Sequence, residues 1–315
     1  MTDPSPRASG VSLLAVRRLR LVEAAAPPVP PEEQRAMHRA WDEAVHANPS
    51  LFDGPVVACA GLAPEGHHGF VVTWVRTTYR RHALRRVPGA TACLPSLFVS
   101  VLQPTDDGRV LVGRMSSSTA APGRWQLPGG SVEPPPAGKP LDVAALGRHA
   151  ARELAEETGV ELPAEDLTLW CLTRAENGTI GVQFLAPARP ESLLGERFTA
   201  LLSDGTARGE DPELDRTALI RSQADVTALG GTQVDYLEPV MHTVQWQALL
   251  LSGALPAVHA LKDAGLPAVL GLWMLSSLGA SRLFPFHFGH WLRGPAAREE
   301  AERAWRDPAR TSGPR

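Results

Sequence analysis

One helix limits what this chain can fold into more than any other segment, because its two sides have opposite chemistry. The sequence predicts it from Val143 to Thr158, with Asp142 as its N-cap and Gly159 as a left-handed C-cap. One side of the helix carries small or apolar residues: Ala150, Ala151, Leu154 and Ala155. This side can pack on a sheet, which leaves the other side of the helix for charged groups.

The charged side of this helix carries Glu153, Glu156 and Glu157, whose spacing makes them project in one direction. Like charges at this spacing repel each other, so the cluster needs a compensating cation. Arg152 lies four residues before Glu156 and can pair with it. A hard divalent ion, Mg²⁺ or Mn²⁺, fits three carboxylates best. On this stretch alone, a solvated acidic face remains the alternative interpretation.

The order of elements around the helix resembles the signature of the Nudix hydrolase family. That signature reads G-x5-E-x7-R-E-(apolar)-x-E-E-x-G-(apolar), and here a strand and the turn "LPGGSVE" (127–133) precede the helix across a loop. The second half of the signature is matched at every defined position, by Arg152, Glu153, Leu154, Glu156, Glu157, Gly159 and Val160.

The first half of the signature departs from the family pattern, and two alignments are open. If Gly130 is its first glycine, an insertion around "PPPAGKPL" separates the turn from the helix. If the count runs back strictly from Arg152, Gly138 takes the glycine position and Ala144 the glutamate position. We favour the insertion because "GGSVE" looks like the family's turn. In both alignments the first glutamate is missing; since that position is not usually a metal ligand in the family, activity is not excluded.

The resemblance implies a fold and a reaction. The fold is an α/β/α sandwich with a mixed sheet, and the reaction is Mg²⁺-dependent hydrolysis of a nucleoside diphosphate linked to another group. The metal ligands implied are Glu153, Glu156 and Glu157, with a backbone carbonyl near Gly129. Glu156, Glu157 and Arg152 are then the catalytic residues, with Glu157 as a candidate general base and Arg152 holding a glutamate in place.

Four further residues are candidates for substrate contact from their positions at the ends of predicted strands and turns: Arg114, Trp125, Arg174 and Glu176. Trp125 precedes the glycine turn, where its ring can stack on a base or sugar. The bland alternatives are core packing for the tryptophan and ordinary surface charge for the others.

A second, weaker resemblance concerns the substrate. The branch of the Nudix family that hydrolyses UDP-glucose and UDP-galactose has a similar leader, matched here by Trp41, Asn48, Pro49, Leu51, Phe52, Gly54 and Tyr79. This resemblance implies hydrolysis of a UDP-sugar to UMP and a sugar 1-phosphate. The alternatives are a pyrophosphatase for ADP-ribose, CoA or a prenyl diphosphate, and a non-catalytic Nudix-like domain that binds a nucleotide.

The chain divides into three parts in this interpretation. We expect an N-terminal α+β extension over 1–89, the Nudix domain over 90–252, and a C-terminal helical extension with a tail over 253–315. Within the domain, the apolar runs 96–104 and 108–115 around "DDG" predict one hairpin, and 167–175 with 179–187 predict another.

Composition limits which partners, metal sites and cellular compartments we expect for this chain. The net charge of −3 does not favour nucleic acid. The three cysteines, Cys59, Cys93 and Cys171, are widely spaced, which argues against disulfides or zinc and predicts free buried thiols. Without a secretory signal, we expect a reducing cytoplasm.

The uncharged segment 264–281 predicts a buried helix rather than a membrane anchor. Its small residues also suit packing against a second copy, as in a homodimer.

Overall fold

The computed structural model describes residues 10–209 and 211–251 of the chain. The N-terminal elements are β1 (Val11–Ala15), β2 (Arg18–Ala24), α1 (Pro31–Ala47), β3 (Pro55–Pro64), β4 (Gly69–Thr78) and the 3-10 helix η1 (Tyr79–Arg86). The elements that follow are β5 (Leu97–Leu102), β6 (Val110–Met115), β7 (Trp125–Gln126), α2 (Val143–Thr158), η2 (Ala164–Asp166), β8 (Thr168–Ala175), β9 (Ile180–Leu185), α3 (Glu191–Arg208), β10 (Leu214–Ile220), α4 (Gln223–Ala228) and α5 (Leu237–Leu251).

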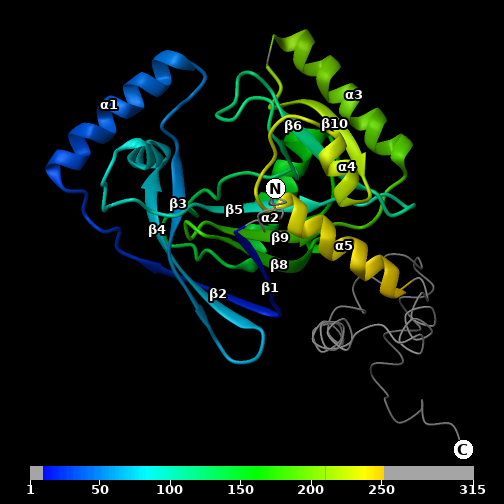
Figure 1. Ribbon diagram of the computed structural model, residues 1–315, viewed down its shortest axis with the longest axis horizontal. Coiled ribbons are helices and arrows are strands. Elements are labelled where there is room, and N and C mark those ends of the chain that lie inside the picture. The colour runs from blue at the N-terminus through cyan, green and yellow to red at the C-terminus, as the bar shows by residue number, and fades with distance from the viewer. Residues whose placement is uncertain (1–9, 210, 252–315) are drawn as a thin grey trace, which may run out of the picture.

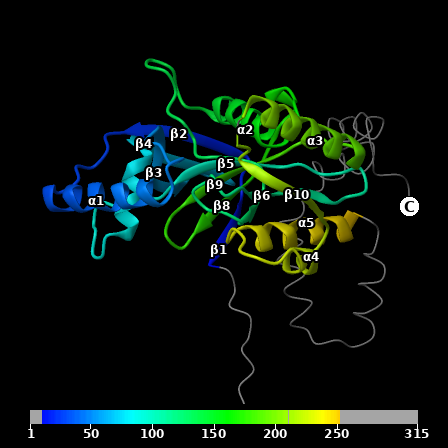
Figure 2. The same cartoon turned by 90° about the horizontal axis from the view of Figure 1, so that it is seen from above.

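The elements from β5 onward form layers, with strands between two groups of helices. Figure 2 shows α2 and α3 on one face of the strands and α4 and α5 on the other. The strands form a four-stranded sheet, ordered β1-β8-β9-β5, and a three-stranded sheet, ordered β10-β6-β7. β5 and β9 are parallel, whereas β8 is antiparallel to both of its neighbours. The expected α/β/α sandwich with mixed strand directions is therefore confirmed.

Helix α2 has the bounds and caps that the sequence predicts. The Asp142 carboxylate accepts a hydrogen bond from the Ala145 N–H at 2.7 Å, and Gly159 ends the helix with a φ of 71°. The apolar side of α2 is fully buried at Leu146, Ala150 and Leu154. Because this side packs into the core beside β5, the acidic side faces away from it.

One of the two predicted hairpins is correct and the other is wrong. β8 and β9 pair antiparallel around the expected turn. β5 and β6, in contrast, separate after their turn: β5 pairs with β9, and β6 pairs with β7 and β10. Only the turn itself is hairpin-like, with a bridge between Pro104 and Val110. Local turn residues predict that two strands reverse direction, but partners far along the chain decide which sheet each joins.

The N-terminal elements form a small unit at one side of the sandwich (Figure 1). Its three-stranded sheet has the order β2-β4-β3, and a separate apolar cluster around Met37, Trp41 and Leu84 joins α1 to η1. The segment before α1 forms two strands, β1 and β2, which belong to different sheets. β1 pairs with β8 of the sandwich, so the N-terminal end of the chain crosses the boundary expected at residues 89 and 90.

The predictions for the cysteines and for apolar helices can also be compared with the structure. All three cysteines are free; Cys59 and Cys171 are buried as expected, but Cys93 is exposed. No helix in the part of the chain that the structure describes has the length and hydropathy needed to span a bilayer. The predicted buried helix at 264–281 lies outside the described residues.

The C-cap of α2 provides a stability prediction. A Cβ on Gly159 would lie 2.6 Å from the Arg197 carbonyl oxygen, whereas one on Gly138, which has a similar φ of 76°, would meet no atom within 4 Å. Gly138→Ala should therefore cost only the left-handed conformation, about 1–2 kcal/mol. Gly159→Ala should lower the free energy of unfolding further, by at least ~1 kcal/mol, because the clash adds to that conformational cost. Equal losses in urea titrations of the two variants would contradict this.

Candidate active site

The centre of the site is the contact between helix α2 and the glycine turn after β7. Glu157 lies in the last turn of α2, is only 2% exposed, and accepts a hydrogen bond from the Gly129 N–H at 2.8 Å. Its neighbour in space, Glu153, lies directly against Gly130: a Cβ on that glycine would be 2.3 Å from Oε2 of Glu153. Two glutamates of the helix thus meet the two glycines of the turn.

Gly129 is required at the turn by the backbone of β5, whereas Gly130 leaves room for the Glu153 carboxylate. Gly129 has a φ of 151°, and a Cβ on it would lie 2.2 Å from the Val99 carbonyl oxygen of β5. Gly138, the glycine of the alternative alignment, lies in the loop before α2 with nothing near its Cβ position. The geometry therefore supports the alignment in which Gly130 begins the signature and a loop is inserted before the helix.

The carboxylates of the site make one another harder to ionise. Burial raises the pKa of Glu153 to about 7, and the nearby charges of Glu213 and Glu156 act in the same direction. Burial also raises the pKa of Glu157 well above its ordinary value, against the opposing effect of the Gly129 N–H. Glu213, just before β10, has a raised pKa because its carboxyl group is partly desolvated and faces Glu156. The structure thus contributes a fourth acidic group to the site.

Arg152 lies at the outer edge of this acidic group. Its guanidinium is 3.0 Å from Glu133, 3.6 Å from Glu153 and 3.8 Å from Glu156. It also donates to Nδ1 of His149 at 2.8 Å, while Nε2 of the same ring lies 3.0 Å from the Ser131 carbonyl oxygen. Burial and the adjacent Arg152 lower the pKa of His149. The neutral ring therefore links the arginine to the glycine turn.

The donor set fits a hard cation, although it is only partly assembled. Glu157 has no cationic partner among the described residues, and a buried carboxylate without one is costly to ionise. Within residues 10–209 and 211–251, however, no three His, Cys, Asp or Glu side chains are close enough together to form a ready-made metal site. The side chain of Glu156 is 63% exposed. Glu153 and Glu157 are therefore in place at the turn, and Glu156 is not.

Of the four predicted substrate residues, two are engaged within the protein. Trp125 is 3% exposed and packs in the apolar core between the strands and α5, so its ring is not available for stacking on a ligand. Arg114 forms a two-point ion pair with Asp215, with distances of 2.8 and 3.1 Å. These partners explain both residues structurally.

The other two predicted substrate residues, Arg174 and Glu176, lie around the β8–β9 turn. Arg174 lines a small cavity of about 110 Å³ together with Cys59 and Pro95. The Glu176 side chain lies against the backbone of Gly10, before β1. No contact joins either residue to the glutamates of α2 within the described residues, so the structure does not bring them together with the site.

Three residues of the site were not predicted from the sequence, although one of them, His149, has a local signal. His149 precedes Glu153 by four residues, so helical spacing alone places the two side by side. Glu133 lies in the turn that the signature marks, but the inserted loop hides its relation to Arg152. Glu213 has no local signal, because only the path of α3 and β10 returns it to α2.

Comparison with known proteins gives a family match for the middle part of the chain. Residues 96–215 match the family model described as NUDIX domain. This match covers β5 to the start of β10, including the glycine turn and α2. Together with the sandwich fold, it shows that this part of the chain is similar to Nudix domains. No curated protein matches the chain.

Solved structures that match the chain share little sequence with it. A NUDIX hydrolase from Nitrosomonas europaea is 19% identical, over 49% of this chain and 89% of that one, with a TM-score of 0.27. A MutT protein from Methanosarcina mazei Go1 is 22% identical, over 37% and 97%, with a TM-score of 0.23. A MutT/nudix family protein from Enterococcus faecalis is 19% identical, over 40% of this chain and 43% of that one, with a TM-score of 0.25. Similarity at this level carries no information about the substrate.

The raised pKa of Glu153 predicts how stability depends on pH. The folded protein holds a proton on this carboxyl group up to about pH 7, whereas the unfolded chain releases it near 4.5. In chelator, this contribution to stability is complete below the unfolded value and is lost as the pH rises through about 7. Urea unfolding from about pH 5 to about pH 8 should therefore show wild type losing stability relative to Glu153→Gln.

Two controls separate this effect from general titration. Glu165→Gln replaces an exposed glutamate of η2 and should run parallel to wild type. Added Mg²⁺ should stabilise wild type more at the upper end of the pH range, because metal binding requires deprotonated ligands. A difference between wild type and Glu153→Gln that stays constant with pH would contradict the assignment.

Proposed function

We propose that this protein is a divalent-metal-dependent Nudix pyrophosphohydrolase that cleaves a nucleoside diphosphate-linked compound. The observation that carries the proposal is the buried Glu157, which is hydrogen-bonded to the glycine turn and whose pKa is raised by burial and by the nearby charges of Glu213, Glu153 and Glu156. A purely structural helix gains nothing from burying a carboxylate among other carboxylates, since the arrangement raises the cost of ionising each one. A site that binds cations and a polyanionic substrate accounts for that cost, because bound cations stabilise the ionised carboxylates.

The reaction is a hydrolysis of a phosphoric anhydride. The oxygen of water forms a bond to one phosphorus, the bond between that phosphorus and the bridging oxygen breaks, and two phosphate monoesters leave. Bound Mg²⁺ or Mn²⁺ supplies positive charge that offsets the repulsion between water and the negatively charged diphosphate. Glu153, Glu156, Glu157 and the Gly129 carbonyl are the groups we assign to holding it.

The remaining roles fall to side chains around the turn. Glu157 accepts the proton of the attacking water, a role favoured by a pKa above the ordinary glutamate value. Arg152 positions Glu153 and Glu156 through its ion pairs, and His149 and Glu133 hold Arg152 in turn. Arg152 is thus a positioning residue in this proposal rather than a group that touches the substrate.

For the substrate, we propose a UDP-sugar, cleaved to UMP and a sugar 1-phosphate. Support comes from the N-terminal unit, whose α1 and Asn48 region lies against the loop between β6 and β7 of the Nudix domain. Of the residues that resemble the leader of the UDP-sugar branch, Asn48, Pro49 and Leu51 line a cavity shared with this loop, where they can contribute to substrate recognition. We further propose that the enzyme acts in the reducing cytoplasm.

The first test of activity concerns metal dependence and the roles of Glu156 and Glu157. Chelator should abolish turnover, and Mg²⁺ or Mn²⁺ should restore it. Glu156→Gln and Glu157→Gln should each lower kcat by at least ~10²-fold, comparable to the loss of a main electrostatic element. Glu165→Gln is the matched control and should behave as wild type. Full activity in excess chelator, or wild-type rates in both glutamine variants, would leave α2 as a solvated acidic face.

Product analysis gives the second test. Wild-type protein with Mg²⁺ should be incubated with UDP-glucose, UDP-galactose, ADP-ribose, CoA and a prenyl diphosphate, and the products identified by mass. We expect UMP and a hexose 1-phosphate to form with the highest kcat/KM. Faster cleavage of ADP-ribose or CoA would keep the hydrolase and change its substrate. Nucleotide binding without any product would instead indicate a non-catalytic domain.

A further inference from the structure

An open cavity of about 440 Å³ lies where the N-terminal unit meets the Nudix domain. One wall is the end of α1 and the segment after it, with Ala47, Asn48 and Leu51, and Arg86 lies beyond them at the end of η1. The other wall is the loop between β6 and β7, with Ser117, and the segment before β10, with Asp211. The cavity therefore combines two parts of the chain, of which only the second lies within the Nudix match.

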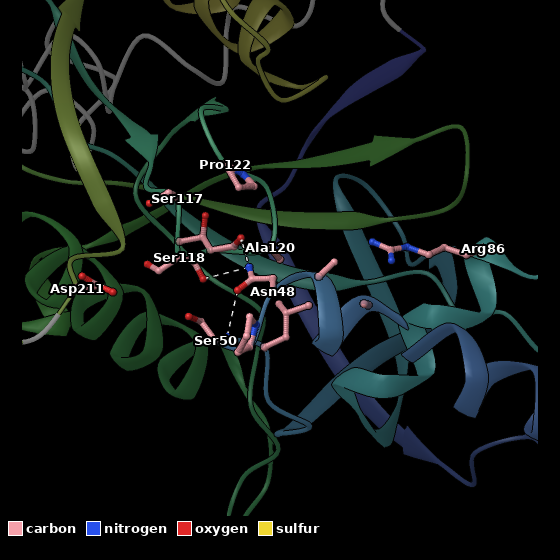
Figure 3. Close-up of a pocket in the computed structure, with 13 residues that line it drawn as sticks. Asn48, Ser50, Arg86, Ser117, Ser118, Ala120, Pro122 and Asp211 are labelled. Atoms are coloured by element: carbon pink, nitrogen blue, oxygen red, sulfur yellow. Dashed lines mark hydrogen bonds between the residues drawn. The ribbon is translucent and has the colours of Figure 1, made fainter. Parts of the chain in front are cut away.

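Asn48 holds the two walls together. Its side-chain N–H groups donate to the Thr119 carbonyl oxygen at 2.9 Å and the Ser118 carbonyl oxygen at 3.3 Å, and its oxygen accepts from the Ser50 N–H. Figure 3 shows this amide between the loop and the segment after α1. All these bonds are internal to the protein. Asn48 therefore shapes the cavity, and other residues of the lining are the ones available to bind a ligand.

The electrostatics of the cavity disfavour a phosphate. The C-terminal end of α1 faces it, and the last carbonyls of a helix carry partial negative charge. The Asp211 carboxylate adds a full negative charge, and it forms no ion pair within the described residues. Figure 3 places Arg86, the single cation of the lining, apart from Asp211. Hydroxyl groups, in contrast, can donate to carbonyls and to a carboxylate.

The remaining polar groups of the lining also suit a ligand with several hydroxyls. Ser117 is exposed and its hydroxyl has no partner among the described residues, while the hydroxyls of Ser118 and Ser116 pair with each other at 2.8 Å. A carboxylate, a free hydroxyl and helix-end carbonyls provide acceptors and donors at several points. Small side chains such as Ala47 and Ala120 leave room between them.

The cavity adjoins the acidic site through residues 211–213, the segment just before β10. Asp211 lines the cavity, and Glu213, two residues later, faces Glu156 and raises the pKa of Glu153. The Ser116 N–H, at the start of the cavity's loop, donates to the Glu213 carbonyl oxygen at 2.8 Å. A ligand in the cavity can therefore belong to a molecule whose diphosphate lies at the glutamates.

From this arrangement we infer that the cavity binds the neutral, polyhydroxylated ring of the substrate, the sugar on the far side of the diphosphate. The inference rests on the proposed function for the position of the diphosphate. In it, Asp211 and Ser117 bind ring hydroxyls, and the N-terminal unit determines which sugar the enzyme accepts. The nucleoside lies outside this cavity.

The test compares two substrates that differ only in the sugar, UDP-glucose and the methyl ester of UDP. Asp211→Ala removes the carboxylate, and Ala120→Leu fills the cavity. In each variant the ratio of kcat/KM for UDP-glucose to that for the methyl ester should fall about tenfold or more, as expected for the loss of a hydrogen bond to a charged group. The controls Asp204→Ala and Ala63→Leu change exposed residues outside the cavity and should keep the wild-type ratio.

A ratio that stays unchanged in both cavity variants would overturn the inference. If the ratio is unchanged because kcat/KM falls equally for both substrates, the cavity holds the nucleoside instead. A direct binding measurement separates this result from a failure of the proposed function. Saturation-transfer NMR with methyl glucoside or methyl galactoside, in chelator, should show binding to wild type that Asp211→Ala weakens. Binding without any hydrolysis would keep the sugar site and reject the hydrolase; no binding to wild type would reject the sugar site.

Discussion

The hydrogen bond from the Gly129 N–H to Glu157 is the contact on which the site depends. It joins the last turn of α2 to the turn after β7, and it is the only neutralising contact shown for that carboxylate within the described residues. The turn lies so close to the backbone of β5 that Gly129 cannot carry a side chain, and Gly130 leaves room for the Glu153 carboxylate. The sandwich therefore fixes Glu153 and Glu157 at the turn before any ligand arrives, so that only Glu156 has still to be ordered when a ligand binds.

Fixing carboxylates in this way has a cost that the surrounding residues limit only in part. Arg152 contacts Glu153 and Glu156 but not Glu157, and its own position is set by His149 and Glu133. The missing first glutamate of the signature is instructive here. Glu133, from the other end of the turn, forms an ion pair with Arg152, so the inserted loop changes the route of the chain without leaving the arginine unsupported.

The sequence predicts the helical part of this arrangement well because its signals are local. Asp142, the spacing of Glu153 and Glu157, and Gly159 lie within a single helix and its caps, and the structure has each where the pattern places it. The β5–β6 hairpin was wrong, and Trp125 takes the alternative of core packing rather than ligand stacking, for the opposite reason. Strand partners and burial depend on residues far along the chain, and β9, β10 and α5 determine them here.

The same distinction explains why the cavity beside the site has no counterpart in the sequence analysis. Asn48 has a turn-forming role at the end of α1 that is visible locally, but its bonds to the Ser118 and Thr119 carbonyls depend on how the N-terminal unit packs. Asp211 is likewise an ordinary exposed acid until β10 places it beside the end of α1. In a Nudix domain the glutamate helix can supply the same chemistry for many substrates, so discrimination must come from what surrounds it. Here residues that precede the family match supply one wall of the neighbouring cavity, opposite Ser117 and Asp211, which gives the N-terminal unit a reason to be packed there.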